Sequence, residues 1–376
     1  MPRRGIAPLP ATLLTAVPAL ALGTLGLAVV ATAAGHATGA GTGAPARFAV
    51  RQLASLVFGA ALGFAAARAG LRRLLDAAPV LFVIALVGTA AVFLPGIGVR
   101  ASGASRWLRI GPLTGNPAPF LIGATGLLIA ASLAVPRGRG LARPPVAVGA
   151  TLIAVALMAI EPDFSSAAVA LAVAAAAFLG GGVAFRRVVP PALLAFALLA
   201  LGASRFGYVG ARWRGFLTPE QDRLGRGFEV RQLARINAAA SPHGVGLGHG
   251  SARRHLHAPA SDYVYAVVRE ELGRPGALGV IAAWLALAVG AALVARAIRG
   301  EPGGRAAALA AATALVAPAA LHVAVCKGWL PIIGVSMPFL SYDPAATIAS
   351  GAEIGLLAAC ALAAPAADQR THSHSP

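Results

Sequence analysis

Long uninterrupted apolar segments dominate this chain and constrain its fold more than any other feature. Blocks of about 16 to 24 apolar residues follow one another from residue 11 to residue 364, and a helix of about 20 residues crosses the hydrocarbon core of a bilayer. Only 12% of the residues are charged, against about 25% in a soluble domain. The pattern predicts an all-α integral membrane protein and excludes a soluble enzyme, a disordered chain and a nucleic-acid-binding protein.

The apolar blocks predict about ten transmembrane helices in a single polytopic domain, residues 1–376. Their expected positions are 11–34, 47–67, 78–95, 117–135, 145–160, 164–184, 189–204, 276–295, 306–326 and 344–364. One large polar segment, residues 205–262, separates the seventh span from the eighth, and long loops in compact proteins are often functional. A short polar tail, residues 368–376, is expected to be disordered.

Arginine residues recur in every second gap between the spans and account for most of the net charge of +18. The positive-inside rule places these gaps, and both termini, in the cytoplasm. Membrane lipids with anionic headgroups are the expected partners of these cations. The polar segment 205–262 then lies outside. The gap 96–116 departs from the alternation, because it also carries Arg100, Arg106 and Arg109.

Acidic residues are scarce, 13 in the whole chain, so each one is informative. Asp163 precedes the sixth span, where its carboxylate is expected to cap the helix through backbone amides. Asp262 closes the long polar segment and precedes a short amphipathic run at 263–272. Glu353 lies within the last span, where an unpaired acid is costly and marks a candidate functional residue.

Two Arg–Trp motifs lie in gaps assigned to the exterior. Trp107 and Trp213 each stand between two arginines, which are Arg106, Arg109, Arg212 and Arg214. For either motif alone we favour an interfacial Trp whose neighbouring Arg side chains reach lipid headgroups. Two such motifs beside a lone carboxylate indicate a clamp for a diphosphate with a general base. These residues alone predict a membrane enzyme or transporter that handles an anionic, lipid-linked substrate.

Six motifs follow one another in a fixed order over residues 80–360. They are Gly103-Ala104-Ser105-Arg106-Trp107-Leu108, Glu161-Pro162-Asp163-Phe164, the segment Phe216 to Gln232, Gly244-Val245-Gly246-Leu247-Gly248, the block Asp262 to Gly273 with Glu270-Glu271, and Pro338-Phe339-Leu340-Ser341-Tyr342. Together they resemble the SEDS (shape, elongation, division and sporulation) family, the FtsW/RodA/SpoVE group. Ten spans with both ends inside is also the plan of that family.

The resemblance implies a peptidoglycan glycosyltransferase of the bacterial cytoplasmic membrane. It would polymerise lipid II into glycan strands on the outer face, in cell division or cell-shape maintenance, beside a class B penicillin-binding transpeptidase. Asp262 stands at the position of the family's essential acid, which accepts a proton or holds a divalent cation such as Mg²⁺ or Mn²⁺. The residues expected to bind the diphosphate of lipid II or of undecaprenyl-diphosphate-linked glycan are Arg106, Trp107, Arg109, Arg212 and Arg214. The supporting residues are Asp163, Gln232, Glu270, Glu271, Ser341 and Tyr342.

Two segments depart from the family's pattern. Residues 116–122 lack the acid and the cation of its Gln-Pro-Ser-Glu-x-x-Lys stretch, and Asp343-Pro344-Ala345-Ala346 stands where the family has Gly-Gly-Ser-Ser. These departures keep open a scaffold that binds a transpeptidase with little turnover. Glu353, which has no counterpart in the pattern, keeps open a transporter or flippase of a lipid-linked precursor.

Overall fold

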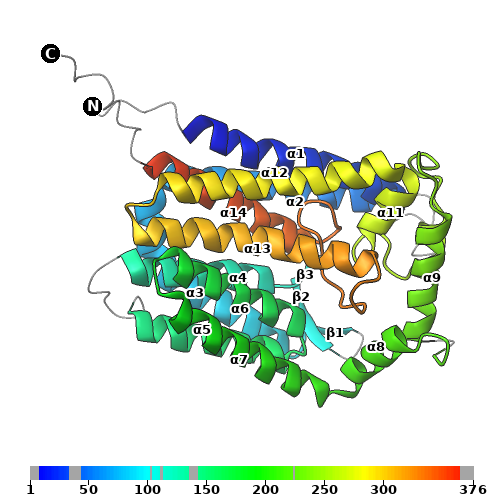
Figure 1. Ribbon diagram of the computed structural model, residues 1–376, viewed down its shortest axis with the longest axis horizontal. Helices are drawn as coiled ribbons and strands as arrows, with labels where there is room; N and C mark the ends of the chain where they lie inside the picture. The colour runs from blue at the N-terminus through cyan, green and yellow to red at the C-terminus, as the bar shows by residue number, and fades with distance from the viewer. Residues whose placement is uncertain are drawn as a thin grey trace.

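The computed structural model describes residues 8–33, 44–101, 104–110, 113–134, 143–222 and 225–364 as a bundle of near-parallel helices (Figure 1). Within this part, seven helices are long and apolar enough to cross a membrane: α1 (Pro8–Ala33), α2 (Ala44–Ala69), α3 (Leu71–Ala90), α7 (Phe185–Ser204), α12 (Gly273–Ala297), α13 (Pro302–Cys326) and α14 (Pro344–Ala363). Three shorter apolar helices complete the bundle: α4 (Ala118–Ala134), α5 (Pro144–Ile160) and α6 (Phe164–Gly180).

These elements confirm a helical, multi-pass membrane protein with a helix at each of the ten expected spans. The main difference is the start of α3, which begins at Leu71 and not at residue 78. Its first turns contain Arg72, Arg73 and Asp76, which are polar but remain good or neutral helix residues. Apolarity therefore locates the membrane-crossing part of a helix, whereas the helix itself extends further. The expected disordered tail, 368–376, lies outside the described residues.

Close packing between α2 and α14 fixes one wall of the bundle. A Cβ atom added to Gly63 would lie 2.4 Å from the carbonyl oxygen of Gly351, and one added to Gly355 would lie 2.1 Å from that of Gly63. Glycine at these positions therefore allows the two helix backbones to touch, as small residues do in membrane helices. Next to α14, the long helix α13 packs against α4, α6 and α12.

A small antiparallel sheet occupies the gap between α3 and α4, which the all-α prediction missed. After a short turn of 3₁₀-helix, η1 (Ala91–Phe93), the strands β1 (Gly98–Ala101), β2 (Ala104–Ile110) and β3 (Leu113–Gly115) pair in the order β1-β2-β3. Alternate residues of a strand point to opposite faces. This alternation is interrupted at Arg106, because the register shifts between the pairs Val99–Trp107 and Arg100–Ser105 and leaves Arg106 as an extra residue in β2.

The polar segment 205–262 folds over one end of the bundle, here called the loop end (Figure 1). It contains α8 (Gly207–Leu217), α9 (Arg226–Ala239) and α10 (Ala252–His255), and α11 (Val264–Glu271) leads from it into α12. Gly244, Gly246 and Gly248 have φ angles of 82°, 92° and 78°, a region that favours glycine. The glycine run therefore makes tight turns. The turns α6–α7 and α12–α13 lie at the opposite end of the bundle.

Candidate functional site

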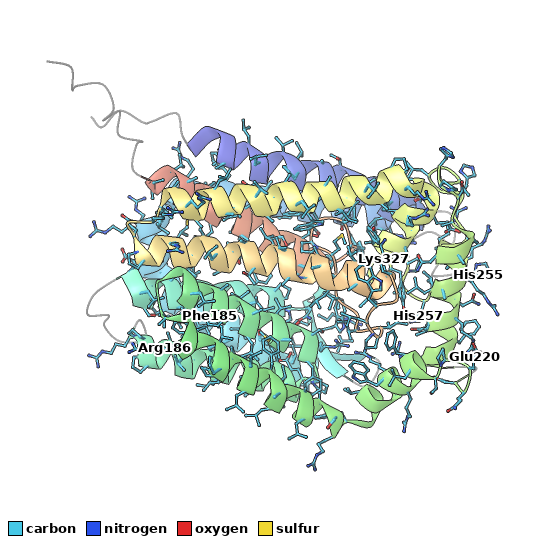
Figure 2. All side chains as sticks on the ribbon, viewed as in Figure 1. Phe185, Arg186, Glu220, His255, His257 and Lys327 are labelled. Carbon is cyan, nitrogen blue, oxygen red and sulfur yellow. The ribbon has the colours of Figure 1, made fainter. Side chains whose placement is uncertain are left out.

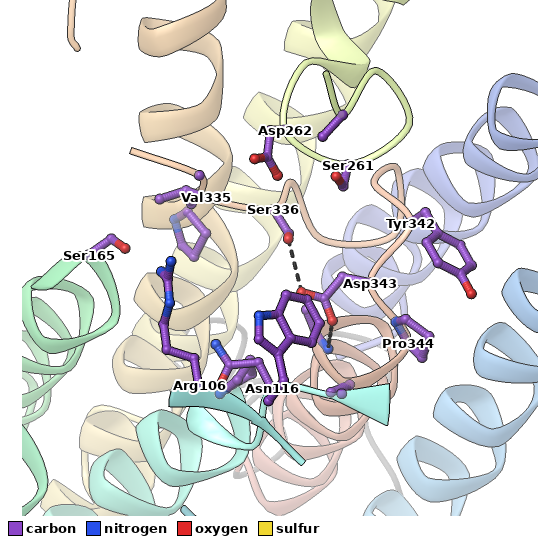
Figure 3. A pocket seen from close by; sticks show the side chains of 18 of the residues that line it. Arg106, Asn116, Ser165, Ser261, Asp262, Val335, Ser336, Tyr342, Asp343 and Pro344 are labelled. Carbon is purple, nitrogen blue, oxygen red and sulfur yellow. Dashed lines mark hydrogen bonds between the residues drawn. The ribbon is translucent and has the colours of Figure 1, made fainter. Parts of the chain in front are cut away.

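A cavity of about 1550 Å³ opens at the loop end and continues between the helices (Figure 3). Its walls come from the sheet, from the segments around α9 and α10, from the loop before α14, and from α2, α4, α6, α13 and α14. Several of the expected site residues line it, namely Arg106, Trp107, Asp163, Arg212, Asp262 and Tyr342. Segments separated by more than 200 residues in sequence thus meet at one polar cavity.

Asp262 projects into this cavity from the turn before α11 (Figure 3). Burial raises the pKa of its carboxyl group, and the neighbouring carboxylates Asp343 and Glu229 raise it further. A hydrogen bond from Ser261 and the positive charge of Arg106 act in the opposite direction, but the net shift of the Asp262 pKa is upward. A carboxylate with a raised pKa is a stronger base than an exposed one.

The loop before α14 holds the backbone next to Asp262 in place. Ser341 Oγ donates to the carbonyl oxygen of Ser261 at 2.6 Å, and the amide of Tyr342 donates to that of Ala260 at 2.8 Å. The Tyr342 ring points away from Asp262 (Figure 3) and packs edge-on against Phe48, with 4.8 Å between ring centroids. Ser341 and Tyr342 therefore fix the position of the Asp262 segment, and neither presents its polar group to Asp262.

Arg106 is held at the opposite wall by Asp163. Its Nη1 lies 3.8 Å from Asp163 Oδ1, while its Nε is buried and has no hydrogen-bond partner. Asp163 also accepts hydrogen bonds from Asn116 Nδ2 at 3.1 Å and from the amide of Ser166 at 3.2 Å. The second of these bonds confirms that Asp163 caps α6. The Arg106 pair explains why this gap carries arginine, since the guanidinium has a partner at the cavity.

Six of the expected residues do not line the cavity; they are Ser341, described above, Glu270 and Glu271, described below, and Arg109, Arg214 and Gln232. Arg109 and Arg214 are exposed, and neither lines the cavity. Gln232 lies beside a separate small pocket on α9, with Glu220, Arg231 and Arg235. Of the two Arg–Trp motifs, only Arg106, Trp107 and Arg212 thus meet at the cavity, because strand and helix geometry turn the remaining members outward.

Glu270 and Glu271 bind the backbone of the loop that precedes Asp262. Glu270 accepts hydrogen bonds from the amides of Ser251 and Ala252, each at 2.8 Å, and from Ser251 Oγ at 2.6 Å. Glu271 accepts from the amides of Gly248 at 2.9 Å and Gly250 at 3.3 Å. The amides of the glycine turns thus bind an anionic group, which is a carboxylate of the chain itself. Both acids hold the segment that brings Arg253 and Arg254 to the cavity.

The sequence analysis missed three contributors to the cavity wall. Asp343 caps α14, accepting from the amide of Ala346 at 3.0 Å and from Ser336 Oγ at 2.9 Å, and burial raises its pKa. Its position directly before Pro344 is a helix-start signal that could have identified it. Arg253 contributes a buried Nε without a hydrogen-bond partner. Glu229 accepts from Arg226 Nη1 and from the Tyr263 hydroxyl, at 3.0 and 3.2 Å.

The side chains at the cavity do not form a dedicated metal site. The described residues contain no group of three His, Cys, Asp or Glu side chains placed to hold a metal ion. Both oxygens of Asp343 already accept hydrogen bonds, which leaves Asp262 as the candidate ligand. Mg²⁺ is often bound by one or two carboxylates together with substrate phosphates. The protein side chains alone do not fit a cation, and we derive no step through one.

The fold and the cavity define a class of protein: a polytopic membrane protein whose carboxylates and arginines meet in one cavity at the end of its bundle. The family described as cell cycle protein, FtsW/RodA/SpoVE, matches residues 12–364. The chain belongs to this family.

Named relatives and solved structures agree with this assignment. The Probable peptidoglycan glycosyltransferase FtsW of Alkalilimnicola ehrlichii is 31% identical over 91% of this chain and 87% of its own length. That of a Thioalkalivibrio species is 32% identical over 92% and 87%. A chain solved in a study of the structural coordination of polymerization and crosslinking by a peptidoglycan synthase complex has a TM-score of 0.71 at 24% identity, covering 92% of this chain and 96% of that one. The rod shape determining protein RodA of Thermus thermophilus has a TM-score of 0.64 at 22% identity, covering 91% and 95%. These two structures share the fold.

Proposed function

We propose that this protein is a peptidoglycan glycosyltransferase that polymerises lipid II, with Asp262 as the general base. One observation carries the proposal: Asp262 and Arg106 face a common cavity from opposite walls, within range of electrostatic interaction. The names of the relatives support the reaction type. The substrate would enter with its sugars and diphosphate at the loop end.

In the proposed reaction, a hydroxyl group of the acceptor sugar attacks the anomeric carbon of the donor. The hydroxyl proton passes to the Asp262 carboxylate as the new carbon–oxygen bond forms, and the bond to the diphosphate breaks. The raised pKa of Asp262 makes this transfer easier. Negative charge then grows on the departing undecaprenyl diphosphate, which needs positively charged donors.

Arg106 and Arg253 are the best candidates for these donors. Both side chains line the cavity, and Arg106, which Asp163 anchors through Nη1, keeps 17% of its side chain exposed to reach a phosphate oxygen. Arg212 also lines the cavity and adds positive charge. Arg109 and Arg214, which are exposed, have a smaller part in this proposal.

The distribution of cations supports an orientation with the loop end outside the cell. Arg186 lies at the opposite end of the bundle (Figure 2), in the first turn of α7. Arg72 lies in the first turn of α3 and Arg299 in the turn between α12 and α13, which also belong to that end. Under the positive-inside rule this end faces the cytoplasm of a bacterial inner membrane, and both termini lie there.

A class B penicillin-binding transpeptidase is the proposed partner. The solved relative from a peptidoglycan synthase complex, whose description couples polymerization with crosslinking, supports such an assembly. A scaffold that binds a transpeptidase with little turnover is the second candidate function. The departures from the family's pattern at 116–122 and 343–346 favour it. The glycosyltransferase and the scaffold differ in whether glycan forms from lipid II.

The deciding experiment incubates purified protein with labelled lipid II and resolves the products on a gel. The assay is run with and without a co-purified transpeptidase and with added Mg²⁺, Mn²⁺ or a chelator. Glycan polymers in any arm support the glycosyltransferase. Stable binding of the transpeptidase without polymer under every condition would replace it with the scaffold.

A further inference from the structure

Glu353 places a carboxyl group inside the bundle, far from the reaction proposed above. It lies nine residues after Pro344 in α14, which corresponds to about 14 Å along the helix axis. That is the middle of a helix long and apolar enough to cross a membrane. Its side chain lines the inner part of the cavity, among apolar residues of α4 and α13 such as Ile122, Ala314 and Pro318.

The neighbouring helix leaves space for this carboxyl group. A Cβ atom added to Gly123 of α4 would lie 2.1 Å from Glu353 Oε1. Any other residue at position 123 would therefore push the carboxyl group out of its place. Glycine inside a helix lowers helix stability, and here it leaves room for the carboxyl group, which ends a flexible side chain and would move aside for a Cβ atom.

The arginines at the far ends of two helices packed against α14 lie away from the middle of the bundle: Arg68, which is exposed, in the last turn of α2, and Arg305 in the first turn of α13. Among the described residues, Glu353 has neither a hydrogen bond nor an ion pair. The α1 and α4 helices carry no ionisable side chain along their lengths. On α2, Gly63 touches Gly351 of α14 and so marks the depth of Glu353. Arg51 also lines the cavity, but it lies 12 residues before Gly63. Twelve residues correspond to about 18 Å along α2, so Arg51 lies near the loop end.

The remaining neighbours are occupied or distant. His322 of α13 contacts the Val335 carbonyl oxygen at 2.6 Å and the Tyr265 amide. Cys360, seven residues further along α14, is the one ionisable group that interacts electrostatically with Glu353, and its thiol donates to the Gly304 carbonyl oxygen. The ionisable residues of α3 and α12 lie in their end turns, as Arg72 and Arg296 do.

A carboxylate without a partner is unfavourable at this depth in a membrane, whereas a neutral carboxyl group is tolerated. We propose that Glu353 is an intramembrane proton-binding site: its carboxyl group holds a proton at neutral pH and exchanges it with water that enters the cavity from the loop end. The ligand is a proton and not a metal cation, since the surrounding side chains are apolar. This inference does not depend on the glycosyl transfer proposed above.

The direct test uses dicyclohexylcarbodiimide, an apolar reagent that reacts with protonated carboxyl groups. The acid proton moves to a nitrogen of the reagent and the carboxylate oxygen adds to its central carbon. The later shift of the acyl group to nitrogen loses no atoms, so the labelled peptide gains the mass of one reagent. We expect labelling of Glu353 in the purified full chain at about pH 6, declining as the pH rises to about 9.

Three substitutions and one internal control interpret the labelling. Glu353→Gln should abolish it at this peptide. Gly123→Ala should slow it several-fold by displacing the carboxyl group, whereas Gly149→Ala, on an open face of α5, should not. Asp222 is an exposed loop carboxylate whose pKa is lowered by backbone hydrogen bonds, first that from Gly227, and should stay unlabelled. A Glu353 that is never labelled, or that is labelled independently of pH, overturns the proposal.

Two further measurements test the ligand and the route. Labelling should be the same in sodium chloride and choline chloride, because protection by sodium would assign the site to a metal cation. In a chain with Cys326→Ala and Cys360→Ala, the substitution Glu353→Cys should react with a charged, water-soluble thiosulfonate added from the loop end. A cysteine there that reacts only with apolar reagents would contradict the water-filled route.

Discussion

The Arg106 guanidinium lies 3.8 Å from the Asp163 carboxylate, and this pair joins the small sheet to the start of α6. Asp163 is already satisfied by Asn116, Ser165 and Ser166, so it orients Arg106 without occupying all of its donors. The Arg106 side chain lines the cavity and keeps 17% of its surface exposed. An anchored arginine with an exposed guanidinium is a suitable arrangement for binding a phosphate.

Arg106→Ala should weaken polymerisation of lipid II by about tenfold or more, because a hydrogen bond to a charged group contributes about 1.5 to 3 kcal/mol. Arg214→Ala is the matched control. Arg214 is exposed and lies outside the cavity, so its loss should change the rate less than threefold or so. Initial rates in the gel assay compare the two variants. Equal effects would show that Arg106 has no special contact with the diphosphate.

The proposed orientation predicts which residues a water-soluble thiol reagent reaches in intact cells. Glu220 and Arg186 lie at opposite ends of the bundle (Figure 2). In a chain with both native cysteines replaced, Glu220→Cys should be labelled from outside, and Arg186→Cys only after the membrane is permeabilised. Labelling of both sites from the same side would refute the orientation and the positions of the spans.

Much of the fold follows from apolar block length alone, because a membrane helix must satisfy its own backbone hydrogen bonds. The cap at Asp163 and the turns at Gly244 and Gly248 were also predictable, since each depends on neighbouring residues in sequence. The sheet around Arg106 was not predictable, because a short strand gains its stability from pairing and carries a weak local signal. The role of Glu271 as a ligand of the glycine turns was equally hidden, since 21 residues separate Gly250 from it.

The candidate site likewise combines residues that were predictable from the sequence with residues that were not. Arg106 and Asp262 were predicted from the residues and from a family pattern, and the structure brings them to one cavity. Asp343 was seen as a departure from the pattern, but its cap of α14 and its place in the cavity wall required tertiary structure. Arg109 was grouped with Arg106 on sequence distance, but Arg109 is exposed and does not line the cavity.

Glu161 predicts a pH dependence of stability. Its carboxyl is fully buried and both its oxygens lack hydrogen-bond partners, and burial raises its pKa from 4.5 to about 8. Because the folded-state pKa is the higher one, the stabilising effect is complete below pH 4.5 and is lost as the pH rises towards 8. The loss in this window is about 1.4 kcal/mol per pH unit at most.

The measurement is thermal unfolding of the purified protein in detergent between about pH 5 and pH 8. The Tm of the wild-type protein should fall with rising pH, and that of Glu161→Gln should fall less steeply, since glutamine does not ionise. Parallel curves for the two proteins would mean that Glu161 is already ionised at low pH and that a counter-charge stabilises it.

Glu270 predicts local order in the loop before Asp262. Its carboxylate accepts three hydrogen bonds from Ser251 and Ala252, and unpaired buried donors cost about 1 to 3 kcal/mol each. Glu270→Ala should therefore raise amide hydrogen exchange across residues 248–255 by tenfold or more, while exchange in α13 stays unchanged. Glu220→Ala, at an exposed loop position, is the control. Unchanged exchange at 248–255 would refute the role of Glu270.

Polymerisation by Asp262→Asn tests the central claim most directly. Asparagine keeps the size of the side chain and removes the charge, so the protein should fold and bind its transpeptidase as before. With Asp262 as the base, the rate of glycan formation from lipid II should fall by about 100-fold or more. Asp163→Asn, which keeps a good helix cap, should lose much less. Equal rates for these two variants in the same gel assay would contradict the account and remove Asp262 from the mechanism.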